Sequence, residues 1–351
     1  MDSLVNQRIR HARIQRGMSQ QEAANALNIT KQMVSKYETS TVPSSDKLIK
    51  LARLYRTRVD YFFSKPEVEL GEINFRKKSS FSAKSLNALK ESVRLQIENY
   101  LYVENLLHIE PSFKNPLINH PVKSREDVVK AVEMLRKQWN IGNDPIHNII
   151  EMLEDKEIKV IEIDDGSMRF DGLATVIDNK FYVVVVNKRM PIERKRFTLL
   201  HELGHLLLKL KNLEDKEVEK YCNWFSSEML ISSANLRAEL GAHRSSVTVE
   251  ELKNLQEKYG VSIQAIVYKM KDIGLLPENQ LKVFYQRLNA NSVFKAEIDQ
   301  ERFKGSEYSN RFNSLVHHAL AEEVISTSKA SALLGVPLSH LKDSLLTIKT
   351  R

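Results

Sequence analysis

The chain has 351 residues, of which 42% are hydrophobic and 28% are charged, and this composition excludes a largely disordered protein. The length suits two or three domains, and the low counts of 11 glycines and 9 prolines favour long helices over many short strands. A single cysteine excludes a disulfide framework or a cysteine-rich zinc site, and no apolar run is long enough for a transmembrane helix. We therefore expect a mainly helical protein of the cytoplasm.

The formal net charge of +8 is concentrated near the N-terminus. Residues 1–64 contain eleven lysines and arginines against five acidic residues, so this segment carries +6 and the remaining chain only +2. Positive charge gathered in one short segment is typical of a nucleic-acid-binding module. The sequence therefore predicts a basic N-terminal domain attached to a nearly neutral body.

The basic segment is expected to fold into five short helices. Gly17 follows the first helix in the position of a C′ glycine, and Ser19 and Glu22 have the spacing of a capping box at the start of the second. Thr30 is placed to cap the third helix. The expected helices cover residues 4–15, 20–27, 31–38 and 46–55, and a fifth opens at Asp60.

Two short helices joined by a tight turn, the second rich in polar side chains, are typical of a helix-turn-helix. The segment 19–55 resembles the phage-repressor (Xre-type) helix-turn-helix, with Glu38 at its structural acid and Ser40 in place of its usual glycine. The resemblance implies a double-stranded DNA operator as partner. The residues expected to touch phosphates or base edges are Gln20, Lys31, Gln32, Met33 and Lys36. The alternative is a protein-binding bundle whose basic face is only solvated.

The next segment carries little functional information. Apolar residues at helical spacing predict a long helix near 83–109, and a proline-containing extended stretch follows it. Ser124 is placed to cap a further helix, and the next helix is expected over 144–157, with Pro145 near its first turn. A strand then leads to a hairpin around Asp178 and Asn179, because this dipeptide suits a tight turn between β-rich runs.

The strongest chemical signal is the sequence His201-Glu202-Leu203-Gly204-His205. On a helix this spacing places both imidazoles on one face, where they can bind one zinc ion while Glu202 acts on zinc-bound water. Gly204 suggests that a neighbouring strand or a substrate backbone approaches closely. The alternative is a pair of core-edge histidines with a surface glutamate, and a third ligand would decide between the two interpretations.

A second helix after the motif supplies candidates for that ligand. They are Glu214, Glu217, Glu219 and Glu228, and Glu219 lies one helical turn before Asn223. The HExxH motif followed by this pair resembles the glutamate zincins and, more closely, the ImmA/IrrE family of bacterial metallopeptidases, with matching segments at 170–173, 196–208 and 219–232. The resemblance implies that Zn²⁺ is held by His201, His205 and Glu219, that Asn223 supports a ligating histidine, and that Glu228 is the runner-up ligand.

Three further features have plainer interpretations. Cys222 falls in a helical core pattern and is expected to be a small buried residue rather than a ligand or a redox switch. The basic run from Lys188 to Arg196 is expected to be a solvated face rather than a groove for acidic substrates. The helix–Gly-Val–helix layout at 325–345 favours helical packing or dimerisation over a second DNA contact.

The combined expectation is a mainly α protein with a small β-sheet, an α+β fold in four parts. These are a five-helix helix-turn-helix domain (1–64), a helical linker (65–135), a zincin-like metallopeptidase domain (136–245) and a helical C-terminal region (246–351). The implied function is a DNA-binding transcriptional regulator with a zinc-dependent endopeptidase that cleaves a repressor in a stress, phage or mobile-element circuit. The alternative is an antitoxin-like or sensor-type repressor whose zinc domain senses or scaffolds without proteolysis. A homodimer is expected, because repressor-type modules bind paired half-sites.

Overall fold

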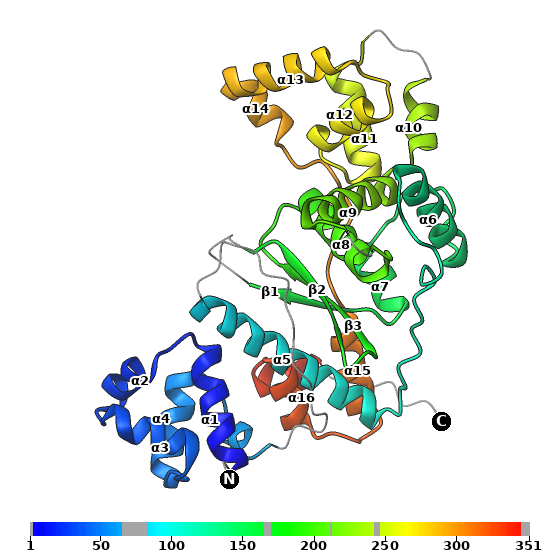
Figure 1. The fold of residues 1–351 in the computed structure, drawn as a ribbon. Coiled ribbons are helices and arrows are strands. Elements are labelled where there is room, and N and C mark those ends of the chain that lie inside the picture. The colour runs from blue at the N-terminus through cyan, green and yellow to red at the C-terminus, as the bar shows by residue number, and fades with distance from the viewer. Residues whose placement is uncertain (1–2, 65–82, 165–169, 211–212, 242–245, 345–351) are drawn as a thin grey trace. The chain divides into compact units, whose positions relative to one another are not determined.

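The protein is mainly helical with one small sheet (Figure 1), as the sequence predicts. The structure, a computed structural model, describes residues 3–64, 83–164, 170–210, 213–241 and 246–344. The chain divides into two compact units: unit 1 combines residues 1–110 with 312–351, and unit 2 consists of residues 111–311. The expected linker range and the expected C-terminal range are therefore each divided between the two units. Within the described residues, no helix has the length and hydrophobicity needed to cross a membrane.

Unit 1 consists of a group of short N-terminal helices, one long helix and the last helices of the chain. The elements are α1 (Leu4–Gln15), α2 (Gln20–Leu27), α3 (Lys31–Thr39), α4 (Ser45–Tyr55), the 3-10 helix η1 (Val59–Phe63), α5 (Ala83–Leu106), α15 (Arg311–Ala321), α16 (Thr327–Leu334) and α17 (Leu338–Ser344). The four helices expected before residue 56 are confirmed. The fifth is a single 3-10 turn rather than an α-helix.

Local hydrogen bonds fix the boundaries of the N-terminal helices. The Ser19 hydroxyl accepts from the Glu22 amide at 3.1 Å, and the Glu22 carboxylate accepts from the Ser19 amide at 2.6 Å. This capping box satisfies amides that the first turn of α2 leaves without helical partners. Asn28 ends α2 in the left-handed conformation at φ 53°, and Gly17 follows α1 at φ 61°. The short-range sequence signals therefore define these helices correctly.

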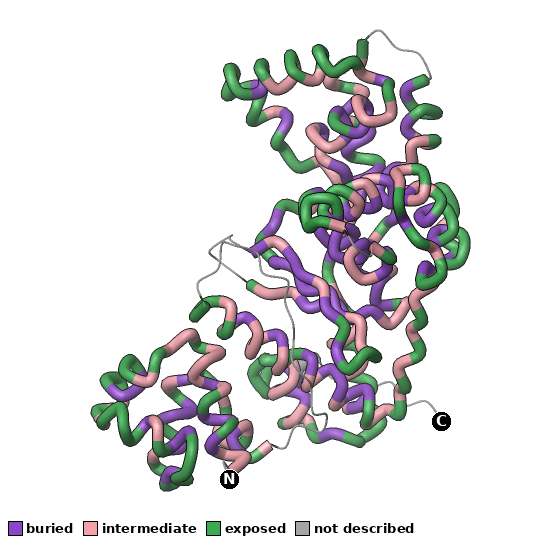
Figure 2. The backbone as a smooth tube through the Cα atoms, in the orientation of Figure 1, coloured by how far each residue is buried: buried purple, intermediate pink, exposed green. Residues whose placement is uncertain are grey.

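Two apolar clusters hold unit 1 together. In the first, side chains from α1 to η1 meet around Ile9, Val34 and Phe62, all fully buried. Figure 2 shows buried and exposed stretches alternating along these helices. In the second, Val103 of α5 packs with side chains of the last helices, including Val316. The expected pair of helices at 325–345 is thus present up to residue 344, and it packs within unit 1.

Unit 2 is built around a three-stranded sheet. Its elements are α6 (Arg125–Gln138), α7 (Ile149–Asp155), β1 (Lys159–Ile163), β2 (Gly172–Ile177), β3 (Phe181–Asn187), α8 (Ile192–Leu207), α9 (Asp215–Leu230), α10 (Ser233–Leu240), α11 (Val249–Tyr259), α12 (Ile263–Asp272), α13 (Glu278–Ala290) and α14 (Ser292–Ile298). The expected helix over 144–157 begins later than predicted, so that Pro145 precedes the N-cap of α7. Asn148 is the N-cap, because its side chain accepts from the Glu151 amide at 3.1 Å.

The sheet has the order β1-β3-β2. Strand β3 pairs in parallel with β1 and antiparallel with β2, so that β2 lies at an edge. Three residues, 178–180, join the paired Ile177 of β2 and Phe181 of β3, and Asp178 and Asn179 take φ values of 52° and 53° in this turn, which confirms the predicted hairpin. Helix α8 packs on β2 and β3, and α9 packs on α8. These contacts place the HExxH helix between the sheet and α9.

The basic run before the HExxH motif is not the uniformly solvated face that the sequence suggests. Arg189 and Arg194 are exposed and pair with Asp164 and Asp171. The expectation is wrong for Lys195 and Arg196, both of which are buried. The residues that pair with these two buried cations come from distant parts of the sequence, so the local charge pattern gave no indication of them.

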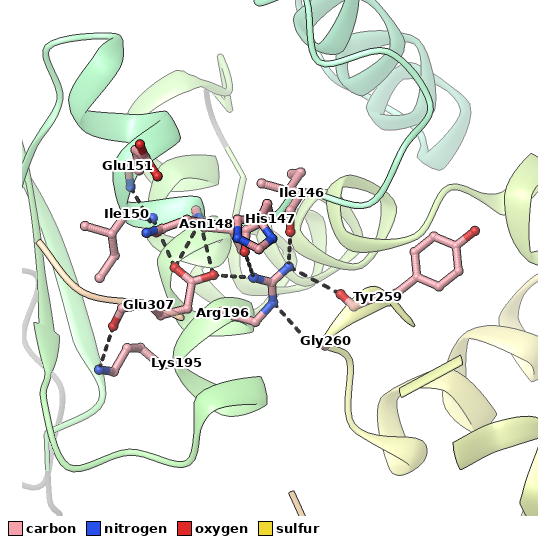
Figure 3. A network of polar contacts seen from close by, with 11 residues as sticks. Ile146, His147, Asn148, Ile150, Glu151, Lys195, Arg196, Tyr259, Gly260 and Glu307 are labelled. Atoms are coloured by element: carbon pink, nitrogen blue, oxygen red, sulfur yellow. Dashed lines mark hydrogen bonds and ion pairs between the residues drawn. The ribbon is translucent and has the colours of Figure 1, made fainter. Parts of the chain in front are cut away.

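Arg196 is at the centre of a buried polar network (Figure 3). Its guanidinium pairs with Glu307 and donates to the backbone carbonyls of Ile146 and Tyr259 at 2.7 and 3.3 Å. The Glu307 carboxylate also accepts from the amide of Ile149 at 2.9 Å, at the start of α7. A buried charge is tolerated when its hydrogen-bonding groups are satisfied in this way. The network ties α7, α8 and the segment after α14 into one body.

Candidate functional site

Helices α8 and α9 approach closely at Gly204. A Cβ atom at this position would lie 3.3 Å from both the Cα of Cys222 and a ring carbon of Phe225, tighter than most real contacts. The expectation that Gly204 makes room for a strand or a substrate backbone is therefore wrong, because the neighbour is helix α9. Because Gly204 has no side chain, α9 comes close enough for Glu219 and Asn223, one turn apart, to contact the histidines of α8.

Three side chains from these helices converge on one point. The Nε2 atoms of His201 and His205 are 3.1 Å apart. The Glu219 carboxylate oxygens lie 3.2 Å from the Nε2 of His201 and 3.3 Å from the Nε2 of His205. Among the described residues, these three form a group whose ligand atoms all lie within 4.8 Å of one another. The structure thus brings together the three residues that the sequence predicts as metal ligands.

The outer ring nitrogens of both histidines have partners on α9. His201 Nδ1 lies 2.9 Å from the side-chain oxygen Oδ1 of Asn223, so the tautomer that donates from Nδ1 leaves its Nε2 lone pair facing Glu219. His205 Nδ1 lies 3.4 Å from the Sγ atom of Cys222, which is fully buried. Sequence reasoning missed this contact, because a small core residue was the expected role of Cys222.

The donor set fits a zinc ion. Zinc bonds of about 2.0–2.1 Å in a tetrahedral arrangement place neighbouring ligand atoms about 3.3 Å apart, close to the three separations found here. When the two imidazoles are doubly protonated, their hydrogen bonds to the carboxylate hold the pKa of Glu219 well below its usual range, so Glu219 stays charged. In the neutral tautomer that donates from Nδ1, the Nε2 lone pair of His201 faces the same point as this carboxylate, where a cation would bind. Two imidazole nitrogens and one carboxylate are a common set of protein ligands in catalytic zinc sites.

Glu202 lies beside the edge strand β2. It is buried, with 4% of its surface exposed, and a Cβ atom at Gly172 of β2 would lie 3.1 Å from its Cγ. The same Cβ would lie only 2.6 Å from Cγ2 of Thr198, so a glycine is needed where β2 packs on α8. Sequence reasoning did not single out the packing role of Gly172, although the residue lies in a segment matched to the family.

Other candidates do not join the cluster. Glu228 is buried away from it and pairs with Lys269 of α12 at 2.7 Å. The amide and hydroxyl of Ser233 also donate to the Glu228 carboxylate. Glu228 therefore stabilises the packing of α9 on α12.

The predicted DNA-reading residues lie on the open side of α3. The side chains of Lys31, Gln32, Met33 and Lys36 are all exposed, and even the apolar Met33 exposes 37% of its surface. Val34 and Tyr37 of the same helix face the core. An exposed polar surface opposite a buried face is the arrangement that a recognition helix requires.

Glu38 joins α1, α2 and α3. Its buried carboxylate accepts from Arg13 Nε at 2.5 Å and from the Gln20 amide at 2.9 Å. Gln20 therefore uses one amide hydrogen inside the domain, which leaves the other for a phosphate. The assignment of Glu38 as a structural acid agrees with this position.

Comparisons with known proteins assign both regions. Residues 9–62 match the helix-turn-helix family, and residues 153–271 match a peptidase family described as the IrrE N-terminal-like domain. The chain therefore combines a helix-turn-helix domain with a metallopeptidase-like domain of the IrrE type. The HTH-type transcriptional regulator ImmR of Bacillus subtilis (strain 168) is 40% identical over 65 residues. That match covers 18% of this chain and 51% of the relative, so the chain spans about half the length of this curated protein.

Proposed function

We propose that the protein is a DNA-binding transcriptional regulator whose second domain is a zinc-dependent endopeptidase that cleaves a repressor protein. The observation that carries the proposal is the convergence of His201, His205 and Glu219 within 4.8 Å, next to Glu202 and an edge strand. The helix-turn-helix and IrrE-type assignments support the two halves of the proposal. We further propose that the chain acts on its operator as a homodimer, as repressor-type modules commonly do.

The residues of this chain have distinct roles in peptide hydrolysis. His201, His205 and Glu219 would hold zinc, which supplies a Lewis acid and an acidified water when bound. Asn223 fixes the ring orientation and tautomer of His201 through its 2.9 Å contact. Glu202 accepts a proton from the attacking water and donates it to the leaving amine. Burial of Glu202 keeps bulk water from competing for that proton.

Two variants separate metal binding from hydrolysis. Glu219→Gln should lose stoichiometric zinc by elemental analysis, whereas the matched control Glu217→Gln, an exposed residue of the same helix, should retain it. Glu202→Gln should retain zinc but should no longer cleave repressors encoded by neighbouring genes. Cleavage is measured by mass spectrometry. A Glu202→Gln variant that still cleaves would contradict the mechanism. Zinc binding without cleavage by the wild-type chain would favour a sensor or scaffold role.

The DNA half has its own test. Alanine at Gln32 and Lys36 should abolish sequence-selective binding in a mobility-shift assay, because these exposed side chains would read base edges. Lys50→Ala on α4 is a control that removes one positive charge outside α3. Unchanged selectivity in the Gln32 and Lys36 variants would contradict the assignment of α3 as the recognition helix.

A further inference from the structure

Unit 1 contains a cavity of about 800 Å³ that neither the metal-site cluster nor the exposed face of α3 uses. Its walls come from four segments: Arg8 of α1, the end of the helix-turn-helix domain, α5, and α16 with the turn that follows it. All of its lining residues belong to unit 1. Its volume falls within the range of about 300–1,000 Å³ that is usual for small-molecule sites.

The lining carries excess positive charge. Arg8 is neutralised by Glu98 at 2.8 Å, and Arg58 by Asp60 at 3.2 Å. The other two basic lining residues are Arg56 and Lys329. Within the part of the chain that the structure describes, neither of them has an ion pair with a carboxylate. Among the described lining residues, the four cations thus exceed the two carboxylates by two, and this excess favours an anionic ligand.

Aromatic and apolar side chains complete the walls. Tyr61 of η1 and Tyr102 of α5 both line the cavity, together with Leu333 and Val336 from the last helices. The Lys329 ammonium lies 4.4 Å from the centre of the Tyr102 ring, so a cation and an aromatic surface are adjacent in the wall of the cavity. An aromatic ring beside a cation suits a flat organic anion, because the ring contacts the flat body while the cation pairs with the acidic group.

We propose that this cavity binds an anionic small molecule with an aromatic body. Its acidic group would pair with Arg56 and Lys329, and its flat body would contact Tyr61 and Tyr102. Because the walls join the helix-turn-helix domain to α5 and α16, an occupant would brace these segments against one another. The inference stands independently of the proposed peptidase activity, since none of the lining residues lies in unit 2.

A pair of fluorescent probes tests the proposal on the full chain. The anionic probe is 8-anilinonaphthalene-1-sulfonate, and its uncharged counterpart is N-phenyl-1-naphthylamine. The double variant Arg56→Gln/Lys329→Gln should weaken binding of the anionic probe by about tenfold or more and leave the neutral probe nearly unchanged. The control Arg16→Gln/Lys50→Gln removes the same charge from unit 1 outside the cavity and should change neither affinity.

Location of the bound probe provides a second readout. Hydrogen–deuterium exchange with the anionic probe should show protection in residues 56–64 and 329–337, the two basic walls of the cavity. Ala332→Phe, which fills the cavity, should weaken both probes, with circular dichroism confirming that the variants remain folded. Absence of saturable binding, equal loss in the control variant, or protection confined to other segments would each overturn the proposal.

Discussion

Replacing Arg196 by methionine would test how much the buried network contributes to the stability of unit 2. Methionine is also a long unbranched side chain, but it has none of the donors that now satisfy Glu307 and the carbonyls of Ile146 and Tyr259. Removing one partner of a buried ion pair costs about 3–5 kcal/mol. For a unit of about 200 residues, this corresponds to a fall in Tm of about 6–20 °C.

At low pH the Arg196→Met substitution should cost less stability than at neutral pH. Burial already raises the pKa of Glu307, and removal of the neighbouring guanidinium would raise it further. A carboxyl whose folded-state pKa is raised stabilises the fold while it is protonated, and that contribution is lost as the pH rises through the raised pKa. The Arg196→Met variant should therefore be closest to wild type at low pH and weakest near neutrality.

Tryptophan fluorescence is a suitable assay because the two tryptophans of the chain, Trp139 and Trp224, both lie in unit 2. Unfolding in guanidinium, followed in this way, reports on unit 2 alone. Arg189→Met is the matched control, since its ion pair is exposed and should contribute less than about 1 kcal/mol. Combining Arg196→Met with Glu307→Gln should recover part of the loss, because glutamine removes the unpaired buried charge and its side-chain oxygen can still accept from the Ile149 amide. If Arg196→Met destabilised the unit no more than Arg189→Met, the network would have no special role.

Three other predictions concern unit 2. Burial raises the pKa of Glu154 to about 7, so its protonated form stabilises the fold at low pH. In urea denaturation, the wild type should lose up to about 3 kcal/mol of stability between pH 4.5 and 7, and Glu154→Gln should show no such loss. Gly172→Ala should lower the free energy of unfolding by about 1–3 kcal/mol in the same assay, because the new methyl group clashes with Thr198. Adding Thr198→Ser removes the clashing methyl group and should recover part of this stability. If nothing is recovered, the strain lies elsewhere. Asn223→Ala should weaken zinc binding by about 10–100-fold in competition with a chromophoric chelator, and unchanged affinity would exclude its support of His201.

Much of the local structure could be predicted from the sequence. The capping box of Ser19 and Glu22 and the turn at Asp178 and Asn179 occur where their residue types place them. These features depend on hydrogen bonds and backbone angles within about four residues, so the information lies in the local sequence. The start of α7 was misplaced because Pro145 and Asn148 are both acceptable near a helix start, and the Asn148 cap prevailed.

The candidate site was only partly predictable. The four-residue spacing of His201 and His205 guarantees one helical face, whatever surrounds it. Four glutamates followed in the sequence, and spacing alone did not distinguish among them. A family resemblance predicts Glu219 as the third ligand. In the structure Glu219 faces both histidines, whereas Glu228 pairs with Lys269. Its role as a metal ligand stays a prediction.

The sequence by itself determined the helix-turn-helix elements, the helix that carries the HExxH motif and the concentration of charge in residues 1–64. Only the tertiary structure decided which charges are buried, as Arg196 and Glu307 are, and which neighbour requires Gly204 to lack a side chain. The physical reason is the range of the interactions. Capping and periodicity act within a few residues, whereas the partner of a buried charge is separated from it here by 111 positions and is fixed only when the chain packs.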